Sequence, residues 1–123
     1  MRSILALAPA LTGIFLTVAT VQAENNEFVV VGFGATPCAE ILNSYRKQPS
    51  VASLLLFSYV EGFWSGQNSM LMQAAPSVVK NLAGDKQQIL KALMVECERR
   101  PTEDFGIVVR DRFFQLPTIG KAG

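Results

Sequence analysis

The stretch that decides the fold runs from Val51 to Met72 and reads VASLLLFSYVEGFWSGQNSMLM. Its apolar residues cover nearly every side of a helix, a pattern that belongs to a helix packed on most of its surface. Ser50, directly before it, is expected to cap the helix. We therefore place this helix at the centre of a helical bundle.

Three small residues recur every four positions in this helix, at Ser58, Gly62 and Gly66. Glycine costs about 1 kcal/mol relative to alanine inside a helix, and close approach of another backbone would offset that cost. We expect this close packing inside a soluble bundle. A membrane-type face of small residues is the alternative, but polar residues such as Glu61 interrupt the run. Glu61 itself is expected to point outward rather than to be partly buried.

Three shorter helices flank this stretch, and each has apolar residues three or four positions apart on one face. The inner faces are Cys38, Ile41, Leu42 and Tyr45; Ile89, Leu90, Leu93, Met94 and Cys97; and Phe105, Val108, Val109, Phe113 and Leu116. The expected caps are Thr36, Asp85 (in a capping box with Gln88) and Thr102. Prolines end the helices: Pro49, Pro101 and Pro117. The sequence predicts an all-α fold, a small four-helix bundle with a short extended N-terminal segment.

Residues 1–23 are typical of a secretory signal peptide. Arg2 supplies the positive start, an apolar run follows, and small residues precede a cleavage site expected between Ala23 and Glu24. A retained membrane anchor is the alternative, because the apolar run is only just long enough to span a bilayer. Export leads to an oxidising compartment, where the only two cysteines, Cys38 and Cys97, most simply form one structural disulfide.

Two terminal segments lie outside the expected helical domain, which covers residues 36–117. Residues 24–35 include the apolar run FVVV and are either a short strand or an arm that covers hydrophobic surface. Residues 118–123 are expected to be a disordered tail. The mature chain is thus one small domain.

The charge and residue content argue against several classes of function. All ten acidic residues and every basic residue except Arg2 lie after the leader, so the mature chain is formally neutral and lacks the basic footprint of a nucleic-acid-binding protein. The chain has no histidine, which removes the commonest general base and metal ligand. Glu103 and Asp104 most simply favour a helix N-terminus, and Gly32 and Gly34 do not complete a phosphate-binding loop. We expect no catalytic residue, no metal, no cofactor and no enzymatic activity.

Binding of another protein is the expected activity. The central helix offers more apolar surface than three short helices would cover, and exposed surface of this kind usually marks a protein interface. A well-filled core is the alternative. The candidate partner or dimer surface consists of Leu54, Leu55, Phe57, Tyr59, Phe63 and Trp64.

Two segments around the cysteines resemble a known family. Residues 36–42, TPCAEIL, and 95–101, VECERRP, are similar to the two cysteine segments of the periplasmic acid-stress chaperones HdeA and HdeB. The resemblance implies a periplasmic, disulfide-bonded and usually dimeric helical protein, which loosens in acid and holds unfolding client proteins in solution. It also implies that Cys38 pairs with Cys97, and that residues 51–64 form the dimer and client surface.

The middle block departs from that family. Residues 58–68, SYVEGFWSGQN, are more aromatic and richer in glycine, and are similar to a block in a group of exported helical proteins. A related element occurs in periplasmic immunity proteins that neutralise amidase toxins of type VI secretion. The alternative function is therefore inhibition of one cognate toxin. A third is a hydrophobic-ligand carrier, which needs a cavity between the helices.

Overall fold

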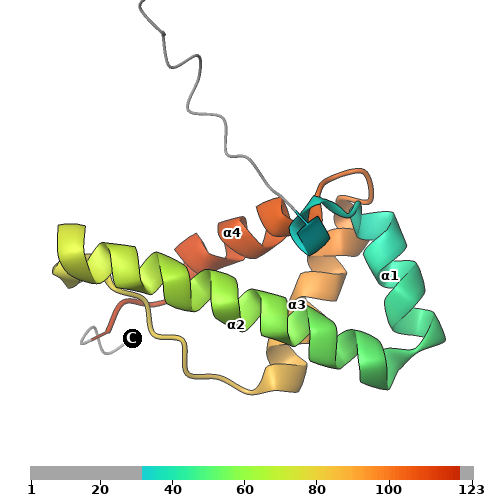
Figure 1. Ribbon diagram of the computed structural model, residues 1–123, viewed down its shortest axis with the longest axis horizontal. Coiled ribbons are helices and arrows are strands. Elements are labelled where there is room, and N and C mark those ends of the chain that lie inside the picture. The colour runs from blue at the N-terminus through green and yellow to red at the C-terminus, as the bar shows by residue number, and fades with distance from the viewer. Residues whose placement is uncertain (1–31, 120–123) are drawn as a thin grey trace, which may run out of the picture.

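The computed structural model describes residues 32–119 (Figure 1). Its elements are η1 (Gly32–Ala35), α1 (Cys38–Lys47), α2 (Pro49–Ala74), η2 (Pro76–Val78), α3 (Lys86–Arg99) and α4 (Phe105–Gln115), where η denotes a short 3-10 helix. The predicted all-α bundle of four helices is confirmed. The predicted leader (1–23), the run proposed as a strand (28–31) and residues 120–123 lie outside the described residues.

The longest helix, α2, spans the width of the molecule, with the other helices gathered along it (Figure 1). It begins at Pro49, with Gln48 as its N-cap, so the predicted cap at Ser50 is wrong. Proline is well suited to the first position of a helix, where its missing N–H has no intrahelical partner. The short link at Gln48 turns the chain from α1 into α2.

The core is continuous, and all four α-helices contribute to it. From α2 it takes one stripe of side chains: Ala52, Leu56, Val60 and Trp64. The predicted inner faces of α1, α3 and α4 are confirmed, with Tyr45, Ile89 and Leu116 half-buried at the margins. The expectation that α2 is packed on most of its sides is wrong, because its partners cover one face and leave the opposite face in solvent.

The loop between α3 and α4 caps α1 through backbone groups. The N–H groups of Cys38 and Ala39 donate to the carbonyl oxygens of Glu103 and Pro101 at 2.8 and 2.9 Å. The helix start therefore needs no side-chain cap, and the structure has Pro37 at that position instead of the predicted Thr36.

The segment before α1 in turn caps the start of α4 through its backbone. The N–H of Phe105 donates to the carbonyl oxygen of Thr36 at 2.9 Å, and Asp104 takes the N-cap position. The predicted cap at Thr102 is wrong, because this residue lies in the preceding turn. The cap predicted for α3 is confirmed, since the Asp85 carboxylate accepts from the Gln88 N–H at 2.9 Å.

The connector between α2 and α3 is held by an amide side chain. Asn68 donates to the backbone carbonyl of Lys80 at 2.7 Å and accepts from its N–H at 2.9 Å. The Lys80 ammonium group donates to the carbonyl oxygens of Phe114 and Leu116, at the C-terminal end of α4. These contacts tie an irregular segment to two helices.

The predicted disorder of the tail from residue 118 is wrong for its first two residues. Thr118 pairs with Lys80 in an isolated bridge. The N–H of Ile119 donates to the carbonyl oxygen of Val79 at 2.9 Å. The tail thus begins as a partner of the connector.

Candidate binding surface

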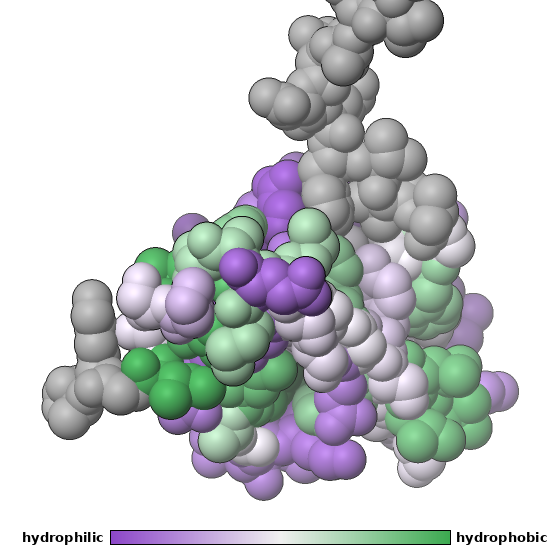
Figure 2. Space-filling model, turned by 60° about the vertical axis from the view of Figure 1, so that its left-hand side comes forward, coloured by the Kyte–Doolittle hydropathy of each residue, from purple (hydrophilic) through white to green (hydrophobic). Residues whose placement is uncertain are grey.

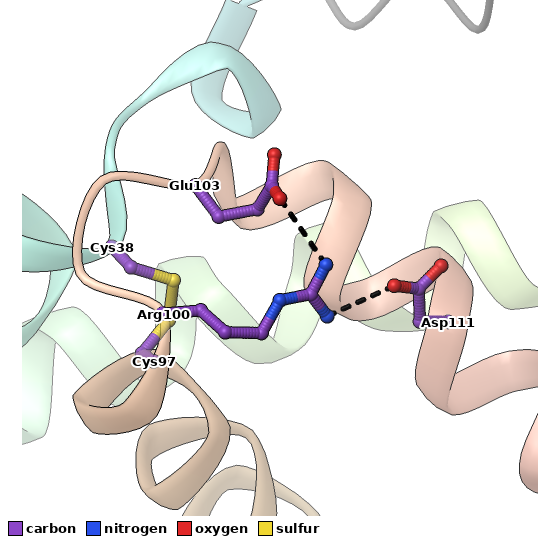
Figure 3. Close-up of a disulfide and its surroundings, with 5 residues drawn as sticks. All are labelled: Cys38, Cys97, Arg100, Glu103 and Asp111. Carbon is purple, nitrogen blue, oxygen red and sulfur yellow. Dashed lines mark hydrogen bonds and ion pairs between the residues drawn. A yellow bond between two sulfur atoms is a disulfide. The ribbon is translucent and has the colours of Figure 1, made fainter.

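The disulfide lies where the first and third helices meet. Cys38 and Cys97 are bonded, with Cα atoms 4.9 Å apart, and both are fully buried (Figure 3). Cys38 begins α1, and Cys97 lies in the last turn of α3. The predicted pairing is confirmed, and its burial among core side chains fits a structural rather than a reactive bond.

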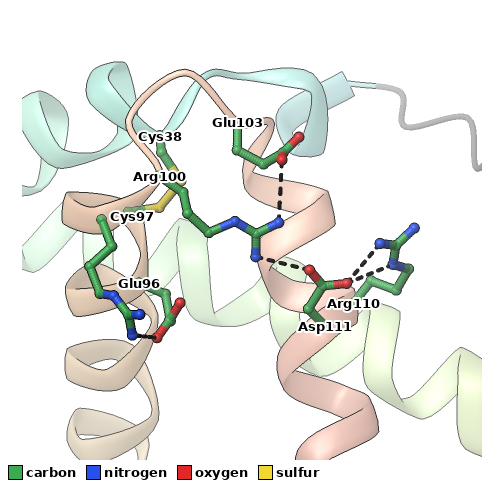
Figure 4. A network of polar contacts seen from close by, with 8 residues as sticks. Cys38, Glu96, Cys97, Arg100, Glu103, Arg110 and Asp111 are labelled. Atoms are coloured by element: carbon green, nitrogen blue, oxygen red, sulfur yellow. Dashed lines mark hydrogen bonds and ion pairs between the residues drawn. A yellow bond between two sulfur atoms is a disulfide. The ribbon is translucent and has the colours of Figure 1, made fainter.

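A charged network lies beside this bridge. Arg100 donates to Asp111 at 2.9 Å and to Glu103 at 3.3 Å, and Arg110 donates to the other oxygen of Asp111 at 2.7 Å (Figure 4). These bonds join the end of α3 and the α3–α4 loop to the side of α4. Glu103, predicted to favour a helix N-terminus, has Arg100 as its partner in the structure.

Asp111 is the titratable centre of this network. Burial raises the pKa of its carboxyl group, but hydrogen bonds from Arg110 and Arg100 outweigh that effect and hold the pKa below its ordinary value. The hydrogen bond to Asp111 also raises the pKa of the Arg100 guanidinium. The network is therefore charged at neutral pH and loses its negative partner in strong acid.

The exposed part of the predicted partner surface is its leucine pair. Leu54 is 69% exposed and Leu55 is 53% exposed, on the face of α2 that turns away from the core. Val51, one turn earlier, is also exposed. Apolar side chains exposed side by side on a regular helix are a feature of protein interfaces.

The aromatic residues of the predicted surface lie closer to the core. Phe57, Tyr59 and Phe63 are half-buried. The Tyr59 ring stacks on Phe63 and lies 5.9 Å from the ring of Phe105 in α4, measured between centroids. Burial raises the pKa of the Tyr59 hydroxyl. These half-buried rings therefore lie at the edge of the predicted partner surface, and the Tyr59 ring connects that edge to α4.

Trp64 does not belong to the surface. It is 3% exposed, and its indole N–H donates to the carbonyl oxygen of Val109 at 3.0 Å. The prediction that Trp64 contributes to partner binding is wrong, because this side chain joins α2 to α4 in the core. Its polar atom has the buried partner that tryptophan requires.

The three small residues also lie elsewhere than predicted. Ser58, Gly62 and Gly66 are exposed, and apart from the adjoining residues and the backbone of α2 itself no atom lies within 4 Å of a Cβ placed at either glycine. The Ser58 hydroxyl donates to the carbonyl oxygen of Leu54, one turn back. The predicted close packing inside the bundle is wrong for the described chain, because the stripe is on the outer face of α2.

Glu61 points outward, as predicted, at the border between α2 and α3. Its exposed carboxylate lies 3.8 Å from the ammonium nitrogen of Lys86. The same nitrogen lies 4.7 Å from the centre of the Phe57 ring. Lys86 thereby covers one edge of the apolar surface.

An open groove of about 350 Å³ is lined in part by Leu55, one member of the leucine pair. Its lining also includes Phe33 of η1, Ile41 of α1 and Leu56 of α2. The sequence did not point to Phe33, which follows a glycine with φ of +62° and makes ring contacts with Tyr59 and Phe105. The apolar run before Gly32 was the only hint that this segment covers hydrophobic surface.

The hydrophobic surface is divided rather than continuous. Figure 2 shows green hydrophobic areas separated by pale and purple side chains on the face it presents. No group of three or more histidine, cysteine or acidic residues suited to a metal occurs within residues 32–119. Over that same range, every helix is too short or too polar to cross a membrane. The outstanding feature of the described residues is thus the exposed apolar side chains of α2, among them Leu54 and Leu55.

Comparisons with protein-family models, curated proteins and solved structures find no match to this chain. The assignment of a function therefore depends on the residues and their arrangement.

Proposed function

We propose that the protein is an exported, protein-binding helical bundle that acts as a periplasmic chaperone under acid stress, in the manner of HdeA and HdeB. The observation that carries the proposal is the exposed pair Leu54 and Leu55 beside the apolar groove. Unfolding proteins expose apolar side chains, and such a surface can cover them without a specific sequence. The expected partners are therefore unfolded client proteins.

The distribution of covalent and charged contacts supports an acid response. Strong acid neutralises Asp111 and so removes the ion pair that holds α4 to Arg100 at the end of α3. The disulfide between α1 and α3 does not depend on pH over this range. Acid would therefore loosen α4 and widen the apolar surface, while the disulfide keeps α1 and α3 joined.

Aggregation assays test this function. The mature chain is mixed with an unrelated enzyme that unfolds at about pH 2–3, below the ordinary carboxylate pKa values, and light scattering is followed. We expect suppression by the unaltered protein, and much weaker suppression by Leu54→Ser/Leu55→Ser. The matched control, Val95→Ser/Phe114→Ser, removes exposed apolar side chains from α3 and α4. Absence of suppression by the unaltered protein would overturn the proposal.

The second candidate is an immunity protein that binds a secreted cell-wall amidase. The preformed groove beside Phe33 favours it, because a groove of this size suits the side chains of one folded partner. Tight binding at neutral pH to the product of a neighbouring toxin gene would support it. The hydrophobic-ligand carrier is less well supported, since the groove opens at the surface and does not lie enclosed between the helices.

A further inference from the structure

We infer that the segment before η1, residues 24–31, binds in the groove between α1 and α2 of its own chain, so that its acidic end meets the C-terminal end of α1. This segment reads ENNEFVVV, in which four apolar residues, Phe28 to Val31, follow an acidic end. It lies outside the described residues, which begin at Gly32. The next residue, Phe33, already belongs to the lining of the groove. The segment therefore starts at the site that we assign to it.

The lining of the groove is polar only where it includes the end of α1 and the link that follows. Its apolar residues combine buried side chains with exposed ones: Phe33, Ile41, Val51, Ala52, Leu55 and Leu56. Among the described residues of the lining, Lys47 is the only charged one. It is the last residue of α1, and it forms no ion pair within residues 32–119. The groove thus matches an apolar segment that carries a negative charge at one end.

The length of the groove fits four extended residues. Phe33 marks one end, because its ring centroid lies 6.3 Å from that of Tyr59. Gln48, where α1 turns into α2, marks the other end, and Val51 lies in the first turn after it (Figure 1). The eight positions from Val51 to Tyr59 correspond to about 12 Å along a helix. Four extended residues cover about 13 Å.

This length brings the acidic end of the segment to the basic end of the groove. If Phe28 to Val31 extend from Gly32 along the groove, Glu27 lies beside Lys47. Gly32 has a φ of +62°, a conformation that suits glycine. A glycine at this position gives the chain the freedom to turn back over α1 and α2. The sequence of the segment thus agrees with the groove in polarity, length and charge.

Covalent attachment favours this segment over a separate molecule. A short tether keeps an effective concentration on the order of 1 mM, so that even weak contacts hold a segment in place. Phe33 also contacts Phe105, with ring centroids 6.5 Å apart, and this contact fixes the start of the segment on the bundle. Fewer backbone bonds then remain to be ordered when the segment binds. A partner of the groove must therefore displace residues 24–31.

A cysteine in place of Ser44 tests whether the groove is covered. Ser44 lines the groove and is exposed, and cysteine is close to serine in size. The native cysteines are bonded and buried, so only the introduced thiol reacts with a bulky maleimide. We expect Phe28→Ser/Val29→Ser/Val30→Ser to raise the reaction rate at Ser44→Cys at least about fivefold in the mature chain, because these apolar side chains supply the binding free energy.

Ser69→Cys is the matched control. Ser69 is exposed near the far end of α2 and lies outside the lining of the groove. Its reaction rate should be the same with and without the three serine substitutions. An unchanged rate at Ser44→Cys, or an equal rise at both positions, would overturn the inference. A small molecule that copurifies in the groove would give the first of these results.

The dependence on protein concentration distinguishes the chain's own segment from that of a second copy. The rate at Ser44→Cys should be the same from about 1 to 100 µM, because these values lie far below the effective concentration of a tethered segment. Slower reaction at the higher concentration would show that another chain covers the groove. That result would overturn the inference.

An exchange of charges tests the position of the segment. Glu27→Lys places a lysine beside Lys47, and we expect about two- to fivefold faster reaction at Ser44→Cys, the range for an exposed ion pair. Addition of Lys47→Glu brings opposite charges together again and should return the rate to within about twofold of its original value. A double variant as reactive as Glu27→Lys alone would overturn the pairing of Glu27 with Lys47.

The inference and the proposed function fail in different experiments, because the labelling rates report the segment and light scattering reports the activity. A covered groove in a protein that does not suppress aggregation would overturn only the function. Suppression by a protein whose groove is open at neutral pH would overturn only the inference.

Discussion

The indole N–H of Trp64 donates to the backbone carbonyl oxygen of Val109 at 3.0 Å, and so joins the longest helix to the last one. Both residues are buried, and the bond connects positions 45 apart in the sequence. It fixes the rotation of α2 about its own axis. That rotation turns Leu54 and Leu55 toward solvent.

Replacement of Trp64 by phenylalanine tests this bond. The variant keeps an aromatic ring but removes the donor and leaves unfilled space, so we expect a loss of about 2 kcal/mol in the free energy of unfolding. Urea unfolding measures this loss. It is followed by circular dichroism, because Trp64 is the only tryptophan and its replacement removes the tryptophan fluorescence signal. Phe114→Leu, on the exposed side of α4, is the control and should change stability by less than about 0.5 kcal/mol. Equal effects of the two substitutions would contradict this role.

Loss of the disulfide should strongly destabilise the bundle. The bond closes a loop of 59 residues, which corresponds to about 4 kcal/mol of restricted freedom in the unfolded chain. We expect the Cys38→Ala/Cys97→Ala variant to melt well below the unaltered protein. A reducing agent should lower the melting temperature of the unaltered protein and leave that of the variant unchanged. A small shift, equal in both proteins, would show that the bridge is not a principal source of stability.

Asp111 should make stability depend on pH in one direction. Its pKa is lower in the folded protein than in the unfolded chain, so its stabilising contribution is present above the unfolded value of about 4 and is lost as pH falls through the folded value. We expect Asp111→Asn to reduce the free energy of unfolding at pH 7 by about 1 kcal/mol, a value reduced for partial exposure.

The difference between Asp111→Asn and the unaltered protein should shrink as the pH approaches about 2, where both side chains are neutral. Glu98→Gln is the control, because Glu98 is exposed and its ion pair with Arg46 spans 3.6 Å. This control should shift stability by less than about 0.5 kcal/mol. A difference for Asp111→Asn that stays constant with pH would rule out titration of the network.

The clamp between Asn68 and Lys80 should protect the connector. Asn68→Ala removes both hydrogen bonds to the Lys80 backbone, and we expect a loss of about 1–2 kcal/mol. Hydrogen exchange followed by mass spectrometry should show that residues 76–84 exchange faster in Asn68→Ala than in the unaltered protein. Exchange in α3 should stay the same in the two proteins. Ser69→Ala, one position along and exposed, is the control. Uniformly faster exchange across the whole bundle would argue against a local clamp.

The sequence was most informative where one face of a helix differs from the other. The spacing of Phe105, Val108, Val109 and Phe113 predicts the inner face of α4, and all four are buried. The disulfide was predictable from residue type, because the chain has only two cysteines. The Asp85 cap was predictable from a local pattern, the spacing of Asp85 and Gln88.

The sequence was least informative where every face is apolar. In α2, Trp64 and Leu54 are both apolar, and only contact with α4 decides that the first is buried and the second exposed. The cap of α1 was missed because its partners are carbonyl groups of a loop more than sixty residues away in the sequence. Such contacts depend on tertiary packing and leave no mark on nearby residues.

The central claim is that the leucine pair of α2 binds client proteins, and site-specific photo-cross-linking tests it most directly. A photoreactive residue replaces Leu55 or, as control, Phe114, which is similarly exposed on α4. A labelled client is then added in acid, and only adducts that contain the label are counted. We predict strong client adducts from position 55 and weak ones from position 114. Equal yields from the two positions, or no client adduct at position 55 while aggregation is suppressed, would contradict the account.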